Sequence, residues 1–183
     1  SIHAPVLSTV PLVPVEDVDA CASILQGGIW KGLECAPHPL NRAGSAKGRL
    51  IGGNLTILQT LIGTSDFPVQ SGDILIIEEV DEMLYHLDRM LLHLDRAGVL
   101  SSIAGLCVGD MTDMRDNTKA YGFSSDNPYG LSAEEIIAER LKASAIPVGF
   151  GLPCGHGVRN HPLLLGAPVE MTVGANGTEL RHV

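Results

Sequence analysis

The stretch Asp73-Ile74-Leu75-Ile76-Ile77-Glu78 places four aliphatic residues in a row between two acidic ones. A short, continuous apolar run that is rich in β-branched residues predicts a strand buried on both faces. Strands of this kind belong to sheets that helices cover, and not to open antiparallel sheets with one wet face. The stretch therefore indicates an α/β fold.

The residues that follow extend this pattern into a strand–helix–strand unit. Asp81 is the expected N-cap of a helix that Gly98 ends. Its apolar side chains recur at helical spacing and form one face, namely Leu84, Leu87, Met90, Leu91 and Leu94. A second buried strand is expected from Ile103 to Gly109.

Strands and helices alternate in the middle of the chain, and β-structure dominates both ends. We expect a helix from Asn54, as N-cap, to Gly63, and another that starts at the capping box of Ser132 and Glu135. The fold class is therefore α/β with a mixed sheet. The other expected elements are a strand-like segment at 2–7, a helix at 15–26, an irregular region at 30–50, a buried strand at 146–150 and a hairpin of 168–173 with 178–183.

Composition limits the classes of partner. The chain has 183 residues, 45% of them hydrophobic and 18% charged, which is enough for one sizeable core. A net charge of -9 and only 4% aromatic residues argue against a nucleic-acid partner and against an anionic membrane surface. The four cysteines, Cys21, Cys35, Cys107 and Cys154, form no CxxC pair, and reduced thiols suit a cytoplasmic protein.

Two residues stand out for chemistry. Glu78 comes at the end of the apolar strand, and open α/β sheets place their ligands at such strand ends. His156 lies between two glycines in Gly151-Leu152-Pro153-Cys154-Gly155-His156-Gly157, which allows a sharp turn and an uncovered imidazole. A turn whose histidine merely bonds a neighbouring loop is the competing interpretation. A buried carboxylate needs a partner, and histidine is a natural one.

Other candidates are weaker. Ser45 lies among glycines at 44–48 but has no Gly-x-Ser-x-Gly motif, so we expect a flexible turn or a cleft lining there. His86 and His93 lie seven residues apart on one helix without completing a ligand set, and we expect no metal. Asp110, Asp113 and Asp116 lack the glycine and closing glutamate of a calcium loop and predict a solvated acidic loop.

Several segments in order resemble one family, the LD-carboxypeptidases of bacterial murein recycling, which include the microcin-immunity peptidases. The resemblance extends across about two-thirds of the chain, and the ordered set is more specific than any one piece. The matching pieces are Gly48-Arg49-Leu50-Ile51-Gly52-Gly53-Asn54-Leu55, Leu61-Ile62-Gly63-Thr64, Ile74-Leu75-Ile76-Ile77-Glu78-Glu79-Val80-Asp81-Glu82 with Tyr85, Asp88, Arg89 and Met90, Gly98-Val99-Leu100, Val108-Gly109-Asp110, and Gly151-Leu152-Pro153-Cys154-Gly155-His156.

This resemblance implies a serine peptidase with a Ser-Glu-His triad, in which the glutamate maps to Glu78 and the histidine to His156. The family usually has Glu-Asp where this chain has Glu78-Glu79, so Glu79 is a competing assignment. The segment Gly52-Gly53-Asn54 is expected to shape the substrate cleft. The implied substrate is a murein tetrapeptide that loses D-alanine, and no metal or organic cofactor is implied.

The resemblance also implies a swivelling β/β/α-type domain and places the nucleophilic serine in a separate N-terminal domain. Ser1 follows no methionine and begins in a strand-like segment, so we expect residues 1–183 to be the C-terminal domain alone, inactive without the serine domain. A homodimer is possible. Two alternatives are a module that binds murein peptides without cleaving them and a related peptidase acting on an aminoacyl-nucleotide antibiotic, for which the long 112–131 loop is the place to look.

Overall fold

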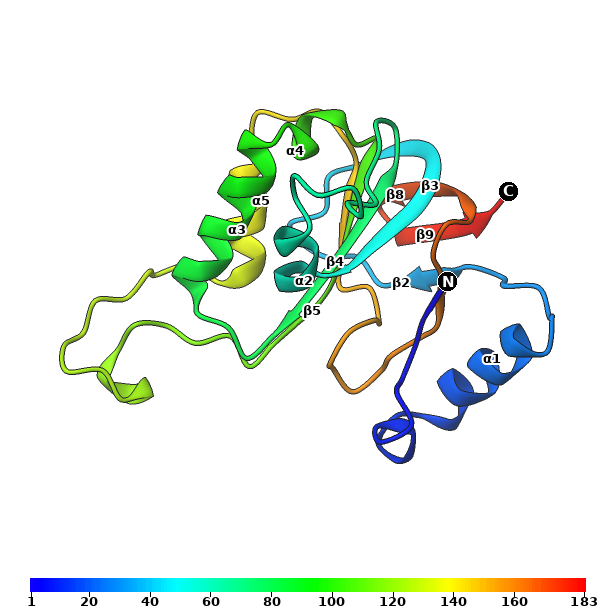
Figure 1. Ribbon diagram of the computed structural model, residues 1–183, viewed down its shortest axis with the longest axis horizontal. Helices are drawn as coiled ribbons and strands as arrows, with labels where there is room; N and C mark the ends of the chain where they lie inside the picture. The colour runs from blue at the N-terminus through cyan, green and yellow to red at the C-terminus, as the bar shows by residue number, and fades with distance from the viewer.

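A seven-stranded mixed sheet forms the centre of the protein in the computed structural model, which describes residues 1–183 (Figure 1). A separate antiparallel pair joins β1 (Ile2–His3) to β7 (Leu163–Leu164). The strands of the large sheet lie in the order β2 (Leu33–Cys35), β9 (Gly177–His182), β8 (Pro168–Gly174), β3 (Gly44–Asn54), β4 (Ile74–Val80), β5 (Gly105–Thr112) and β6 (Val148–Phe150).

Strand β3 joins the two halves of this sheet. Residues 44–49 pair antiparallel with β8, and residues 50–54 pair parallel with β4. The expected flexible turn at 44–48 is therefore wrong, because Ser45 lies opposite Thr172 in a regular ladder. A cleft lining at this segment stays a prediction. The ladder provides hydrogen-bond partners for the backbone N–H and C=O groups of this glycine-rich segment. Local composition alone did not predict this strand.

Helices cover one face of the parallel half. The main ones are α3 (Leu84–Arg96) and α5 (Ala133–Arg140), together with the short α2 (Leu55–Thr60) and α4 (Val99–Ser102). They enclose a hydrophobic core of 20 buried residues, which includes the whole expected apolar face of α3. None of the helices is long and apolar enough to cross a bilayer.

The antiparallel half packs against the other face of the parallel strands. Ile74, Ile76 and Cys107 contribute to a second core, together with Met171 and Leu180 of the β8–β9 hairpin. Strand β9 lies so close to β6 that a Cβ on Gly149 would come within 2.4 Å of Thr178. The layers are thus helix, parallel sheet and antiparallel sheet, and the expected α/β fold with a mixed sheet is confirmed.

Two of the three expected N-cap residues are confirmed. Asn54 accepts a hydrogen bond from the Ile57 N–H, and Ser132 forms the expected capping box with Glu135. Asp81 does not cap α3, which was expected, because its backbone is left-handed with φ 59° and its side chain pairs with Arg115 instead. Met83, in extended conformation, is the N-cap residue and forms a bridge with Arg115.

The N-terminal segment is a strand only at β1 and then continues through a turn, η1 (Val10–Leu12) and α1 (Val15–Leu25). Asp17 of α1 is fully buried and holds this segment in place. It accepts hydrogen bonds from the guanidinium of Arg159, the N–H of Asn160 and the ring of His161. The α1 helix is thereby tied to the segment that follows His156.

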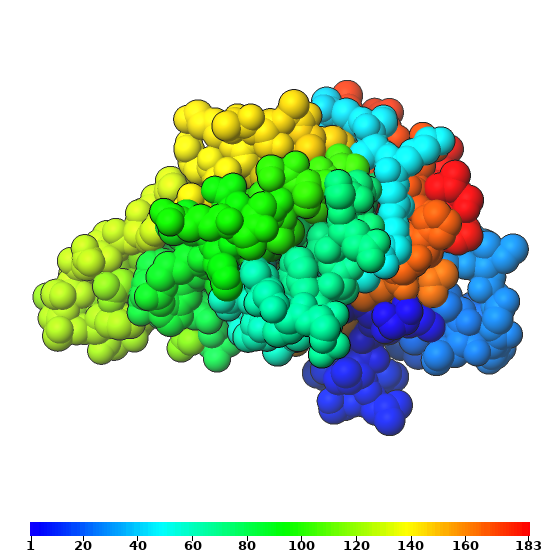
Figure 2. Space-filling model, turned by 45° about the horizontal axis from the view of Figure 1, so that its top comes forward, coloured from blue at the N-terminus to red at the C-terminus, as the bar shows by residue number.

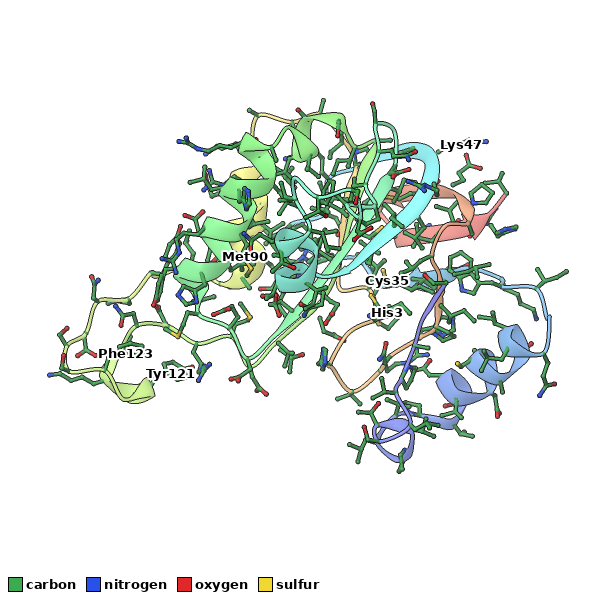
Figure 3. The ribbon with its side chains drawn as sticks, in the orientation of Figure 1. His3, Cys35, Lys47, Met90, Tyr121 and Phe123 are labelled. Carbon is green, nitrogen blue, oxygen red and sulfur yellow. The ribbon has the colours of Figure 1, made fainter.

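The 112–131 loop extends away from the rest of the molecule (Figure 2). It contains one short helix, η2 (Lys119–Tyr121), and the exposed side chains of Tyr121 and Phe123, which Figure 3 labels. Asp116 ties the base of the loop together by accepting hydrogen bonds from the N–H groups of Asn117 and Tyr129.

Candidate active site

The structure brings Glu78 and His156 together, although they are 78 residues apart. The Nδ1 atom of His156 lies 2.9 Å from Oε2 of Glu78. The Glu78 side chain is only 2% exposed, whereas that of His156 is 51% exposed. Because a carboxylate oxygen accepts, this bond places a proton on Nδ1 and leaves Nε2 able to accept one.

Strand alternation explains why Glu78, and not Glu79, contacts the histidine. Successive side chains of a strand point to opposite faces. Ile74 and Ile76 of β4 face the antiparallel layer, and Glu78 continues that row. Glu79 belongs to the opposite row, on the side of the helices.

Glu79 is also buried, but its two oxygens accept four hydrogen bonds from fixed groups. The donors are Asn54 Nδ2, the N–H and hydroxyl of Thr56, and the N–H of Val80. These bonds hold the start of α2 against the end of β4. Both oxygens of Glu79 are therefore occupied by these donors, and neither contacts His156.

The backbone around His156 needs glycine on its N-terminal side. Gly155 has a φ of 123°, and a Cβ there would lie 3.0 Å from Oε2 of Glu78. Only a residue without a side chain allows the loop to approach the carboxylate this closely. The turn thus presents the imidazole, as expected, while its glycine lets the loop pack against Glu78.

A cavity of about 370 Å³ opens beside His156. His3 and other N-terminal residues line one side of it, and Gly155, His156 and Gly157 line another. In Figure 3, His3 lies next to the loop that carries His156. Burial lowers the pKa of His3 below its ordinary value of 6.5, against the opposing effect of Glu78, so its ring is neutral at pH 7.

Sequence reasoning missed two neighbours of the pair, His3 and Asp110. Nothing in the local pattern around His3 marks it, because the fold brings β1 to the site from the far end of the chain. The expectation of a solvated acidic loop is wrong for Asp110, which is half-buried on β5 and accepts a hydrogen bond from the Gly157 N–H at 3.0 Å. Its position at the end of a strand next to β4 was the available signal.

The segment Gly52-Gly53-Asn54 lies at the carboxyl end of β3, next to the site. A Cβ on Gly52 would lie 2.0 Å from the carbonyl oxygen of Ile76, so close pairing with β4 accounts for that glycine. Gly53 adjoins the ring of His3. Asn54 caps α2 with its oxygen and donates to Glu79 with its nitrogen. Substrate contact by these three residues stays a prediction.

The other polar candidates lie outside this arrangement. Ser45 is exposed on β3, His86 pairs with Glu82, and His93 bonds Gln59. Cys154 precedes the histidine by two residues, but burial raises the pKa of its thiol well above 9.0 and keeps it protonated. No group of three or more His, Cys, Asp or Glu side chains in residues 1–183 is arranged to hold a metal ion.

Comparison with known proteins identifies the family. The family described as LD-carboxypeptidase C-terminal domain matches residues 47–171, a range that includes Glu78, Asp110 and His156. The chain belongs to the LD-carboxypeptidase family. The murein tetrapeptide carboxypeptidase of Pseudomonas aeruginosa is 30% identical over 192 residues, which cover 99% of this chain and 57% of that protein.

Solved structures agree with this LD-carboxypeptidase assignment. Muramoyltetrapeptide carboxypeptidase from Oxalobacter formigenes superposes with a TM-score of 0.72 at 26% identity, over 89% of this chain and 53% of that one. The microcin C7 self-immunity protein has the same fold, with a TM-score of 0.74 at 20% identity, over 100% of this chain and 60% of that one. The chain spans about half the length of the curated relatives it matches.

Proposed function

We propose that this chain supplies the general base and its orienting carboxylate to a serine LD-carboxypeptidase that removes terminal D-alanine from murein tetrapeptides. The observation that carries the proposal is the 2.9 Å contact between a buried Glu78 and a half-exposed His156 at the edge of a cavity. A buried carboxylate, a histidine and an exposed second ring nitrogen are what a serine nucleophile needs from its partners.

In this mechanism a serine hydroxyl attacks the carbonyl carbon of the amide that joins an L-centre to the terminal D-alanine. Nε2 of His156 accepts the hydroxyl proton and then delivers it to the departing amine, which leaves an ester on the serine. Water hydrolyses the ester with the same histidine as base. Glu78 keeps the proton of the neutral ring on Nδ1 and stabilises the imidazolium that forms.

The serine belongs to a separate N-terminal domain in this proposal. Two observations support it: the chain spans about half of its relatives, and no hydroxyl or thiol nucleophile in residues 1–183 bonds His156. The cavity that His156 lines is where the serine turn and the scissile amide would enter. The proposed site uses no metal or organic cofactor.

The direct test measures D-alanine release from a murein tetrapeptide. We expect no release by residues 1–183 alone and release by a protein that joins this chain to a serine-bearing N-terminal domain. D-Alanine release by the chain alone that His156→Ala abolishes would contradict the divided triad. Peptide binding with no release by the joined protein would instead favour a binding module.

A second substrate class has one specific observation in its favour. The microcin C7 self-immunity protein of Escherichia coli is 29% identical over 125 residues, and one of its structures contains aspartyl sulfamoyl adenosine. The same Glu–His pair would serve the cleavage of an aminoacyl-nucleotide amide. Parallel assays with a murein tetrapeptide and an aminoacyl sulfamoyl adenosine separate the two, and we expect the murein peptide to be the better substrate.

A further inference from the structure

An extra residue in β5 lies directly beside Glu78. In the parallel pairing of β4 with β5, Ile77 is opposite Val108 and Glu79 is opposite Met111. Glu78 alone is therefore opposite two residues of β5, Gly109 and Asp110. Such a bulge bends a strand and re-aims the side chain next to it.

The bulge turns Asp110 toward the histidine. Val108 and Met111 pack on the helix side of the sheet, so regular alternation would place Asp110 on that side with Val108. Instead Gly109 and Asp110 both face the Glu78 side. A Cβ on Gly109 would lie 3.3 Å from Cβ of Glu78, and Asp110 Oδ2 accepts from the Gly157 N–H.

Asp110 holds the histidine loop at two points, one on each side of His156. Its backbone N–H donates to the carbonyl of Cys154 at 2.9 Å, and its carboxylate accepts from the N–H of Gly157 at 3.0 Å. The loop between these anchors contains only Gly155 and His156. Gly155 in turn packs against Glu78, so the position of the imidazole depends on both anchors.

We propose that Asp110 is a positioning residue for His156: its carboxylate fixes the Gly157 end of the loop so that Nδ1 stays on Glu78 and Nε2 faces the cavity. Asp110 acts on the backbone of the loop and not on the reacting atoms. The kinetic consequence of this proposal rests on the proposed function, whereas the geometric consequence does not. Burial raises the pKa of Asp110 above its ordinary value and the nearby Glu78 carboxylate adds to this, whereas the Gly157 hydrogen bond and His156 oppose it.

The test compares Asp110→Ala, which removes the acceptor, with Asp110→Asn, which retains one. Asp113→Asn is the matched control, because it removes the same charge from an exposed position three residues away. In the chain itself, nitrogen NMR should show the Nδ1–H tautomer of His156 and its hydrogen-bonded proton in the wild type, Asp110→Asn and Asp113→Asn. Asp110→Ala should lose that proton signal and mix tautomers.

In the protein that carries the serine, Asp110→Ala should lower kcat at least about tenfold with little change in KM, since a displaced base loses reactivity rather than binding. Asp110→Asn should retain most of kcat. A role in folding alone would lower thermal stability without changing kcat per folded molecule, and it would give no rescue by asparagine.

Gly157→Ala provides an independent variant, because a Cβ there would lie 2.5 Å from the Asp110 carboxylate. It should lower kcat in the presence of Asp110 and have almost no further effect when combined with Asp110→Ala. An unchanged NMR signal and full kcat in Asp110→Ala, or additive effects in the double variant, would overturn the proposal. If the wild type releases no D-alanine, the proposed function fails, while the NMR comparison still decides the positioning role.

Discussion

Glu78 and Glu79 are neighbours on one strand and are equally buried, but they have opposite surroundings. Glu79 accepts four hydrogen bonds from groups that the fold fixes in place, whereas Glu78 has the half-exposed His156 as its side-chain partner. Burial alone therefore does not distinguish the two carboxylates. The distinction lies in what each one holds: the start of α2 for Glu79 and the imidazole of His156 for Glu78.

The same contrast extends to the two faces of the sheet. On the helix side, the row that contains Glu79 continues into a closed core of 20 residues. On the other side, Glu78 contacts His156, and His156 lines a cavity together with residues of the N-terminal segment. Substitutions on the first face should change stability, and those at the end of the second face should change turnover.

The largest effect is expected from the pair itself. In the protein that carries the serine, Glu78→Ala and His156→Ala should each lower kcat by about 10³-fold or more, because triad members act as a unit. The double variant should be little worse than either single one. Steady-state release of D-alanine measures all three, and strictly multiplicative losses would show that the two residues do not work together.

Glu79→Ala should cost stability instead. The substitution leaves partly buried donors at Asn54, Thr56 and Val80 without an acceptor, so we expect the free energy of unfolding to fall by about 3 kcal/mol. Urea denaturation measures the loss. Turnover per folded molecule should change far less than in Glu78→Ala. A larger loss of turnover in Glu79→Ala than in Glu78→Ala would identify Glu79 as the triad carboxylate.

The hydrogen bonds of Asp17 to the segment after His156 should stabilise the fold in a pH-dependent way. Burial opposes its ionisation, but hydrogen bonds from Arg159 and His161 outweigh burial and lower its pKa below 3.8. A lowered pKa stabilises the folded state fully above 3.8, and that contribution is lost as the pH falls through the lower folded value. Asp17→Asn should therefore cost about 2 kcal/mol at pH 7 and progressively less below pH 3.8. Urea midpoints across pH test this, and a difference that grows in acid would contradict it.

The smallest effects concern helix starts. Ser132→Ala removes a capping box and should cost about 1 kcal/mol of unfolding free energy. Asp81→Gly should change it by less than about 0.5 kcal/mol, because Asp81 is exposed and caps nothing, and glycine adopts the left-handed backbone at this position without strain. Thermal denaturation of both variants gives the comparison, and equal losses would restore Asp81 as a cap.

The sequence predicted those parts of the fold in which local pattern and packing agree. The apolar face of α3, the caps at Asn54 and Ser132, and the buried strand that leads into Glu78 all follow from spacing, although β4 continues two residues further, to Val80. Features set by pairing between distant strands were not predictable. They include the long ladder of β3, the approach of His3 and the bulge that turns Asp110 toward His156. A bulge depends on the register of two strands, which neither strand contains by itself.

In the proposed mechanism, the row of β4 side chains facing the antiparallel layer, and not the row facing the helices, provides the carboxylate for catalysis. The most direct measurement is kcat/KM for D-alanine release by two matched variants, Glu78→Gln and Glu79→Gln, in the protein that carries the serine. We expect a loss of about 10³-fold for Glu78→Gln and less than about tenfold for Glu79→Gln. Equal losses, or a larger loss for Glu79→Gln, would contradict it.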